Sequence, residues 1–279
     1  MIQSLKKAIF LIGLFTILLG QNYNETLGSY LWHFATASYC SAIFLTPWAC
    51  GKACKLHPNV ADITVFHTSV KETHGFVLHD PDTNSIILAI RGTQSLLDIL
   101  DDVCVCFDPY ENMCPGCKVH RGFHERWESA KNQVIGIVEK YKARYPKAKL
   151  ILTGHSLGGA VIAMAAGELS FKFSIDAIYT FGQPRVGNKA YSDWLYSRVK
   201  IIRVTHNKDP VPTLPFSLLG YKHQPLEIFY DVNWRWKQCD LSGEDPTCTR
   251  QYGTMIGGIP DHSLYYNIST DQLKRCSTI

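Results

Sequence analysis

The chain has 279 residues, of which 46% are hydrophobic and 19% charged, and its formal net charge is +4 at pH 7. This length allows one large domain with a substantial core, while so small a charge gives no support to a nucleic-acid partner. We find no internal repeat, low-complexity tract or Pro/Ser-rich linker, so the sequence contains no evident domain boundary.

The first predicted element is an export signal. Two lysines precede an apolar run over residues 8–19, and Gly20 offers a small residue for cleavage. The run is shorter than the ~20 apolar residues of a membrane-spanning helix, so residues 1–20 are interpreted as a secretory signal peptide. An uncleaved anchor is the alternative. Cleavage leaves residues 21–279 as a single domain and lowers the net charge from +4 to +2, because two of the 28 basic residues and no acidic ones are removed.

Strands and helices then alternate along the chain. A β-hairpin is predicted over residues 75–79 and 85–90, which flank the turn-rich DPDTN. A helix is predicted over residues 123–145, where Pro146 ends the pattern. Its apolar residues recur at helical spacing and are Phe123, Trp127, Val134, Val138, Tyr141 and Tyr145. The remaining predicted elements are strands over 148–153, 176–181 and 200–205, and helices over 158–171 and 189–198.

This alternation predicts an α/β fold, with a mostly parallel sheet covered by helices on both faces. Ligands of such sheets bind at the carboxyl ends of the strands. The loops after the predicted strands are therefore the places to search for chemistry.

The stretch TGHSLGGA, residues 153–160, joins a predicted strand to a predicted helix and contains the pattern G-x-S-x-G. Gly154 and Gly158 lack the side chains that would collide around a sharp turn, and Gly159 lets the helix pack closely. Ser156 would then stand above the sheet beside a helix N-terminus, whose free N–H groups favour developing negative charge. The pattern predicts a nucleophilic serine. A glycine turn with an idle serine is the alternative.

A serine nucleophile needs a base and an orienting acid, and hydrolases with this turn carry them in the order serine, acid, histidine. The acid should follow a strand beyond Ser156. Asp209 lies in the loop directly after the predicted strand 200–205, which favours it over Asp176 and Asp193.

Three histidines follow the serine, namely His206, His223 and His262. His206 ends a strand and precedes Asp209, so it does not fit the order. His223 stands just before an apolar strand, where it is interpreted as fastening a loop. His262 lies in the loop-like GGIPDHS near the C-terminus and is the predicted base.

An oxyanion formed at the ester carbonyl needs two N–H donors. One should be the backbone N–H of Leu157. The other should come from the exit of an earlier strand, where IRGTQS offers Gly92 for close backbone approach and Thr93 as donor. An ordinary strand exit is the alternative interpretation of this segment.

Six segments together resemble the secreted class 3 lipases of filamentous-fungal, Rhizomucor-like type. They are IILAIRGTQS, CKVHRGF, LILTGHSLGGA, YTFGQPRVGN, RVTHNKDPVPTLP and DHSLYY, and the resemblance covers residues 29–276 in the same order. It implies the α/β-hydrolase fold with a short helical lid and no metal or organic cofactor. It also implies a catalytic triad and an oxyanion hole, formed by Ser156, Asp209 and His262 and by Thr93 and Leu157 respectively.

Ten cysteines follow the signal, an even number that points to disulfides in an oxidising compartment. Zinc is the alternative for the four cysteines of residues 104–117, although C-x-C-x7-C-x2-C is not a standard zinc-finger spacing. The resemblance implies the pairs Cys40–Cys276, Cys50–Cys54, Cys114–Cys117 and Cys239–Cys248. It leaves Cys104 and Cys106 open, either free or paired in another way. Asn24 and Asn267 are glycosylation acceptors by sequence.

Residues 94–102 follow the oxyanion segment and place apolar side chains mostly on one face of a short helix, namely Leu96, Leu97, Ile99 and Leu100. Exposing four such side chains to water costs at most roughly 6–12 kcal/mol. A lid of this kind stays closed in water and opens against lipid, and the resemblance places a lid here. An ordinary core helix is the alternative.

The sequence thus predicts a secreted serine esterase, with triacylglycerol lipase as the first expectation. Its partner would be a lipid ester at an oil–water or membrane interface, with neither nucleic acid nor an obligate protein partner. A feruloyl esterase for plant polysaccharide, suggested by the C-x-x-C before VHRG, and a phospholipase or mono- and diacylglycerol lipase are alternatives on the same fold. A catalytically inactive lipid-binding protein is the alternative of another class.

Overall fold

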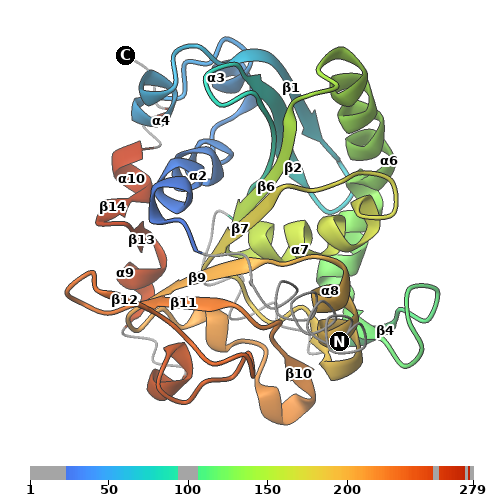
Figure 1. Cartoon of the computed structure of the whole chain (residues 1–279), viewed down its shortest axis with the longest axis vertical. Helices are drawn as coiled ribbons and strands as arrows, with labels where there is room; N and C mark the ends of the chain where they lie inside the picture. The colour runs from blue at the N-terminus through green and yellow to red at the C-terminus, as the bar shows by residue number, and fades with distance from the viewer. Residues whose placement is uncertain (1–22, 94–105, 254–257, 274–275, 277–279) are drawn as a thin grey trace, which may run out of the picture.

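A computed structural model of the chain describes residues 23–93, 106–253, 258–273 and 276 (Figure 1). The predicted signal peptide, residues 1–20, and the predicted lid, residues 94–102, lie outside the described residues. No helix among the described residues is long and apolar enough to cross a membrane.

A main sheet of eight strands runs through the described part of the chain. In spatial order these strands are β1 (Ala61–His67), β2 (His74–Asp80), β3 (Ser85–Ile90), β6 (Lys149–His155), β7 (Ala177–Phe181), β9 (Ile202–His206), β11 (Glu227–Tyr230) and β12 (Trp236–Gln238). The five strands from β3 to β11 run parallel, while β1, β2 and β12 are antiparallel to their neighbours. The mostly parallel sheet predicted from the sequence is confirmed.

Two smaller sheets flank the main one. The first contains, in spatial order, β10 (Tyr221–Lys222), β8 (Gly187–Asn188), β5 (Lys118–His120) and β4 (Phe107–Pro109), and the second pairs β13 (Leu264–Tyr265) with β14 (Ile268–Ser269). The helices are α2 (Glu25–Ala37), α3 (Ala42–Leu45), α4 (Lys52–Leu56), α6 (Arg121–Arg144), α7 (Leu157–Leu169), α8 (Lys189–Arg198), α9 (Ile259–His262) and α10 (Thr270–Leu273). Among the described residues, short 3₁₀ segments cover Val211–Thr213, Ser217–Leu219 and Thr249–Tyr252.

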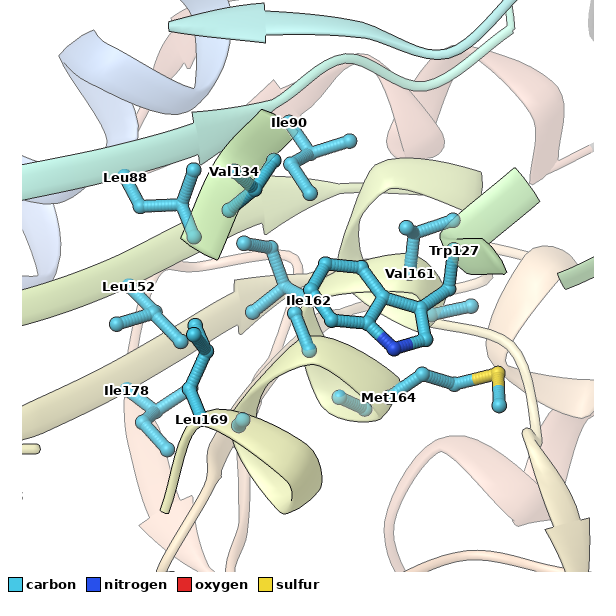
Figure 2. Packing of buried hydrophobic residues seen from close by; sticks show 14 of the residues in the cluster. Leu88, Ile90, Trp127, Val134, Leu152, Val161, Ile162, Met164, Leu169 and Ile178 are labelled. Atoms are coloured by element: carbon cyan, nitrogen blue, oxygen red, sulfur yellow. The ribbon is translucent and has the colours of Figure 1, made fainter. Parts of the chain in front are cut away.

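Helices cover the main sheet on both faces, as predicted, with α6 and α7 on one side and α2 and α10 on the other (Figure 1). The alternation of side chains along each strand separates two cores. In β3, for example, Leu88 packs toward α6 and α7, and its neighbour Ala89 packs toward α2. Figure 2 shows Leu88, Leu152 and Ile178 from three neighbouring strands against the two helices on the first face. Such a two-sided core holds the carboxyl ends of the strands rigidly.

Helix α7 lies almost entirely inside the protein, and only Leu157 and Glu168 along it are not fully buried. Its many glycines and alanines allow this, because a helix with small side chains can approach a sheet closely. A helix that is apolar on all sides is buried rather than amphipathic. The N-terminus of α7, which follows Ser156 directly, is therefore fixed by packing along the whole helix.

The four disulfides implied by the resemblance are all present. Because Cys114 and Cys117 are bonded to each other, the zinc interpretation of residues 104–117 is wrong: their sulfurs are not thiolate ligands. Cys106 is also disulfide-bonded, so it is not a free thiol. Cys104 lies outside the described residues.

A histidine pair beside α2 links stability to pH. The Nδ1 atom of His33 lies 2.9 Å from Nε2 of His57. Burial, with the nearby charges of His57 and Lys52, lowers the pKa of His33 from 6.5 to about 4, and burial also lowers the pKa of His57. Asp80 and Asp82 act on His57 in the opposite sense, raising its pKa. Since the unfolded chain binds these protons near pH 6.5, their contribution to stability is complete above that pH and is lost as the pH falls toward 4.

We therefore expect the free energy of unfolding to decrease between pH 6.5 and 4, with a contribution from His33 of about 1–3 kcal/mol. Urea unfolding at pH 7 and pH 4.5 measures this decrease. His33→Gln should make it smaller, whereas His67→Gln, at an exposed position, should not. An equal decrease in the wild type and His33→Gln would contradict the role of His33.

Candidate active site

Ser156 stands between β6 and α7 in a strained backbone conformation, with φ 59° and ψ −131°. A Cβ at Gly154 would lie 2.6 Å from the carbonyl of Gly158, and one at Gly158 would lie 2.1 Å from the carbonyl oxygen of Ile90. Any other residue at either glycine would therefore open the turn. The sharp strand–turn–helix predicted from G-x-S-x-G is present, and such a conformation at a non-glycine residue costs about 1–3 kcal/mol.

The turn holds the serine by its backbone and leaves its hydroxyl group available. The Ser156 N–H donates a hydrogen bond of 2.8 Å to the carbonyl of Phe181, at the end of the neighbouring strand β7. The side chain is 1% exposed, and its Oγ has no hydrogen-bond partner among the residues that the structure describes. A buried hydroxyl without a partner is uncommon and calls for an explanation in terms of function.

The structure brings the predicted acid and base together. Asp209 follows β9, His262 ends α9, and the Nδ1 atom of His262 lies 2.9 Å from both carboxylate oxygens. Because a carboxylate only accepts hydrogen bonds, Nδ1 carries the proton and donates it. The other ring nitrogen, Nε2, is then the acceptor in the neutral ring, and it has no partner among the described residues.

Two further donors fix the carboxylate of Asp209. The hydroxyl of Tyr265 donates a hydrogen bond of 2.5 Å to Oδ2, and the N–H of Val211 donates one of 2.9 Å to Oδ1. Burial, then the charge and hydrogen bond of Asp209, raise the pKa of Tyr265 well above its usual value, so this hydroxyl stays protonated. Tyr265 lies in the segment DHSLYY, three residues after the predicted base, but its role was not predicted.

His155 connects the serine turn to the histidine. Its ring packs against the ring of His262 with 4.4 Å between centroids, and its Nε2–H donates to the carbonyl of His262 at 2.7 Å. Its Nδ1 atom lies 2.7 Å from the hydroxyl of Tyr39. Since His155 is the immediate neighbour of Ser156, these contacts hold His262 beside the nucleophile. His155 was not predicted to contribute, because it precedes the serine in the chain.

The other predicted candidates lie apart from this cluster or hold structure. His206 stacks on Trp234 with 4.2 Å between ring centroids. His223 fastens a loop, as interpreted from the sequence, with Nε2 donating to the carbonyl of Pro212 at 2.7 Å. Of the rival acids, Asp176 accepts a hydrogen bond from the Leu150 N–H before β7, and Asp193 pairs with Lys189 on the surface.

One feature of His262 differs from the prediction. The segment GGIPDHS was interpreted as a loop, whereas residues Ile259–His262 form the one-turn helix α9. Pro260 lies in its first turn, where proline lacks an N–H that would be unsatisfied in any case.

The two predicted oxyanion residues belong to segments that meet at the serine turn. Leu157 is the first residue of α7, where backbone N–H groups have no acceptor within the helix. Thr93 follows β3, and the intervening Gly92 lies against the turn: a Cβ at Gly92 would come within 3.1 Å of the Ser156 Cβ. The predicted lid residues Leu96, Leu97, Ile99 and Leu100 lie outside the described residues.

The mostly parallel sheet, covered by helices on both faces, defines the α/β-hydrolase fold. The serine on a sharp turn after β6, with a buried acid–histidine pair next to it, is the arrangement of groups found in serine hydrolases. That class is the first conclusion from the fold and the site. Comparison with known proteins gives the family.

The model of the family "Lipase (class 3)" matches residues 87–219. A lipase of Rhizopus niveus is 30% identical over 243 residues, which cover 84% of this chain and 62% of that protein. The secreted mono- and diacylglycerol lipase A of Penicillium cyclopium is 32% identical over 164 residues, 58% of this chain and 53% of that protein. The crystal structure of a lipase from Rhizopus microsporus var. chinensis superimposes with a TM-score of 0.79 at 28% identity, over 90% of this chain and 91% of that one.

Residues 87–219 of the chain match the class 3 lipase family, and the similar proteins are lipases, as the sequence resemblance implied. It spans only 62% of the length of the Rhizopus niveus lipase that it matches. Its activity is therefore argued from its own site.

Proposed function

We propose that the chain is a secreted serine hydrolase that cleaves the carboxylic esters of lipids, with triacylglycerol as its substrate. One observation carries this proposal. The Oγ of Ser156 and the Nε2 of His262 are both buried, and both lack a hydrogen-bond partner among the described residues. They belong to residues held together through His155, and they are the two atoms that must exchange a proton in ester hydrolysis.

The reaction follows from these roles. Ser156 Oγ attacks the ester carbonyl while His262 Nε2 takes its proton, and Asp209 stabilises the imidazolium through Nδ1. The N–H of Leu157 and the donors of Thr93 receive the oxyanion. His262 then returns the proton to the leaving alcohol, and water, activated by the same histidine, hydrolyses the acyl-enzyme.

The substrate class rests on the family and on the sequence of residues 94–102, whose leucines and isoleucine suit a lid that opens against lipid. A specific observation also favours partial glycerides as a second candidate. A relative at 32% identity bears the name secreted mono- and diacylglycerol lipase A.

Export is supported by the basic-apolar start of the sequence and by the disulfides, which form in oxidising compartments. Both predicted glycosylation acceptors, Asn24 and Asn267, are exposed. An interfacial lipid substrate is accordingly the partner that we propose.

We expect the hydrolysis rate of tributyrin to rise sharply when its concentration passes the solubility limit and an emulsion forms. The reason is that a lipid surface takes up apolar side chains that water keeps closed over the site. Titrimetric assay across the limit measures the rise, with Ser156→Ala as blank. Saturable activity without a rise would assign an esterase instead, and feruloyl esters and phospholipids would be the next substrates. Assays on mono-, di- and triolein separate the two glyceride candidates.

A further inference from the structure

The segment that follows Asp209, residues 210–215, is held by side chains from two distant parts of the chain. Four consecutive carbonyl groups of this segment, those of residues 212–215, each accept a hydrogen bond from Arg185 or His223. The segment reverses its direction through the 3₁₀ helix Val211–Thr213, and the N–H of Val211 binds the carboxylate of Asp209. The direction of that carboxylate therefore depends on how the segment is held.

Arg185 makes three of these four contacts. Its Nη1 donates to the carbonyls of Thr213, at 2.5 Å, and Pro215, at 2.9 Å, and its backbone N–H donates to that of Leu214 at 2.7 Å. The other two nitrogens of the guanidinium pair with Glu244, Nε with Oε1 at 2.8 Å and Nη2 with Oε2 at 2.6 Å. One edge of the planar guanidinium group is thus fixed by a carboxylate, and the other edge donates hydrogen bonds to backbone carbonyls.

His223 makes the fourth contact and shares the same carboxylate. Its Nε2–H donates to the carbonyl of Pro212 at 2.7 Å, and its backbone N–H donates to Oε1 of Glu244 at 3.1 Å. Burial, with the charges of Arg203 and Arg185, lowers the pKa of the His223 ring well below its usual value. The ring therefore stays neutral and keeps its Nε2–H directed at the carbonyl.

Arg185 and Glu244 form a buried ion pair, with side chains that are only 4% and 11% exposed. Burial alone would raise the pKa of Glu244, but the hydrogen bonds and charge of Arg185, the His223 N–H and the charge of Arg203 hold it below its usual value. A buried ion pair gives little net stability compared with apolar side chains of the same volume. Its distinguishing property is a fixed geometry.

We propose that Arg185, oriented by Glu244, is a positioning residue for the catalytic acid: it fixes residues 212–215 so that the carboxylate of Asp209 meets Nδ1 of His262. This inference rests on the proposed function. Arg185, which is the R of GQPRVGN, and Glu244 then both have a role in the reaction without contacting the substrate.

The decisive variant is Arg185→Lys, which keeps the charge but cannot bind Glu244 through two nitrogens and the two carbonyls through a third. We expect kcat for soluble p-nitrophenyl butyrate to fall about 10- to 100-fold with KM nearly unchanged, as displaced catalytic groups produce. Labelling of Ser156 by a fluorophosphonate should slow in the same proportion. Glu244→Gln, a milder change, should reduce both rates in the same direction if Arg185→Lys does not fold.

A matched control is Arg203→Lys, because Arg203 forms another buried arginine–glutamate pair, with Glu227, and binds the carbonyls of Gln224 and Gly243 instead of residues 212–215. It should lower the thermal unfolding midpoint about as much as Arg185→Lys while leaving kcat within about 3-fold. Equal losses of kcat in the two variants, following their losses of stability, would overturn the proposal.

A double variant separates positioning from general damage. If Arg185 acts only through Asp209, then adding Arg185→Lys to Asp209→Asn should lower kcat no further, since effects of groups acting as one unit are not additive. If the double variant instead shows the product of the two single decreases in kcat, the proposal is overturned, while the proposed function still stands. A wild-type chain that neither hydrolyses esters nor reacts with the fluorophosphonate would overturn both.

Discussion

Ser156→Ala is expected to lower kcat about 10⁶-fold, the loss that removal of a triad nucleophile produces in other serine hydrolases. The reason lies in the turn. Ser156 is the strained residue between β6 and α7, and it supplies the hydroxyl at that position. The hydrogen bond from its backbone N–H to Phe181 does not involve its side chain. The variant should keep its fold and lose its chemistry. Hydrolysis of p-nitrophenyl butyrate and labelling by a fluorophosphonate measure both losses.

A second buried serine provides the control. Ser38 is fully buried and its hydroxyl donates to the carbonyl of Ala35, so Ser38→Ala removes a hydroxyl from an equally enclosed place. It should retain turnover and fluorophosphonate labelling, whatever its effect on stability. Turnover above about 1% of wild type in Ser156→Ala would contradict the assignment, because the predicted residual activity is far smaller.

Much of the fold could be predicted because long elements carry long patterns. The helix α8 was predicted at about its observed bounds, and the hairpin of β2 and β3 was predicted to within one residue at each end. Helix α2 was not predicted, although the sequence contained a signal. Asn24 was interpreted only as a glycosylation acceptor, yet its side chain accepts a hydrogen bond from the Leu27 N–H and caps the helix.

The small sheet of β10, β8, β5 and β4 could not be predicted for a physical reason. Its strands have two or three residues each, too few to show a period of two, and β5 and β10 both pair with β8, which is distant from each of them in sequence. Pairing of this kind follows from the tertiary fold rather than from local preference.

The residues of the candidate site likewise include some that could be predicted from the sequence and some that could not. Ser156 was found from the local pattern of glycines, and Asp209 and His262 from their order after it. The residues that hold them gave no local signal, because Tyr265, His155 and Arg185 act through contacts between distant elements. The double requirement on Asp209, which accepts from both His262 and Tyr265, could be recognised only once the fold had brought them together.

Asp209→Asn is expected to lower kcat about 10⁴-fold, the effect of this change in a triad, because an amide stabilises the wrong tautomer of the histidine. The Val211 N–H and the Tyr265 hydroxyl both donate to the carboxylate, and Nδ1 of His262 lies 2.9 Å from both of its oxygens. Whichever way an amide is turned, its NH₂ group therefore faces Nδ1, which must release its proton and accept. The proton moves to Nε2, and the base toward Ser156 is lost.

The rival acids are the controls for this change. Asp176→Asn keeps an acceptor for the Leu150 N–H, and Asp193→Asn only loses an exposed ion pair with Lys189, so both variants should hydrolyse p-nitrophenyl butyrate at the wild-type rate. If Asp209→Asn keeps the wild-type kcat while Asp176→Asn or Asp193→Asn is inactive, then the residue changed in the inactive variant is the catalytic acid instead of Asp209.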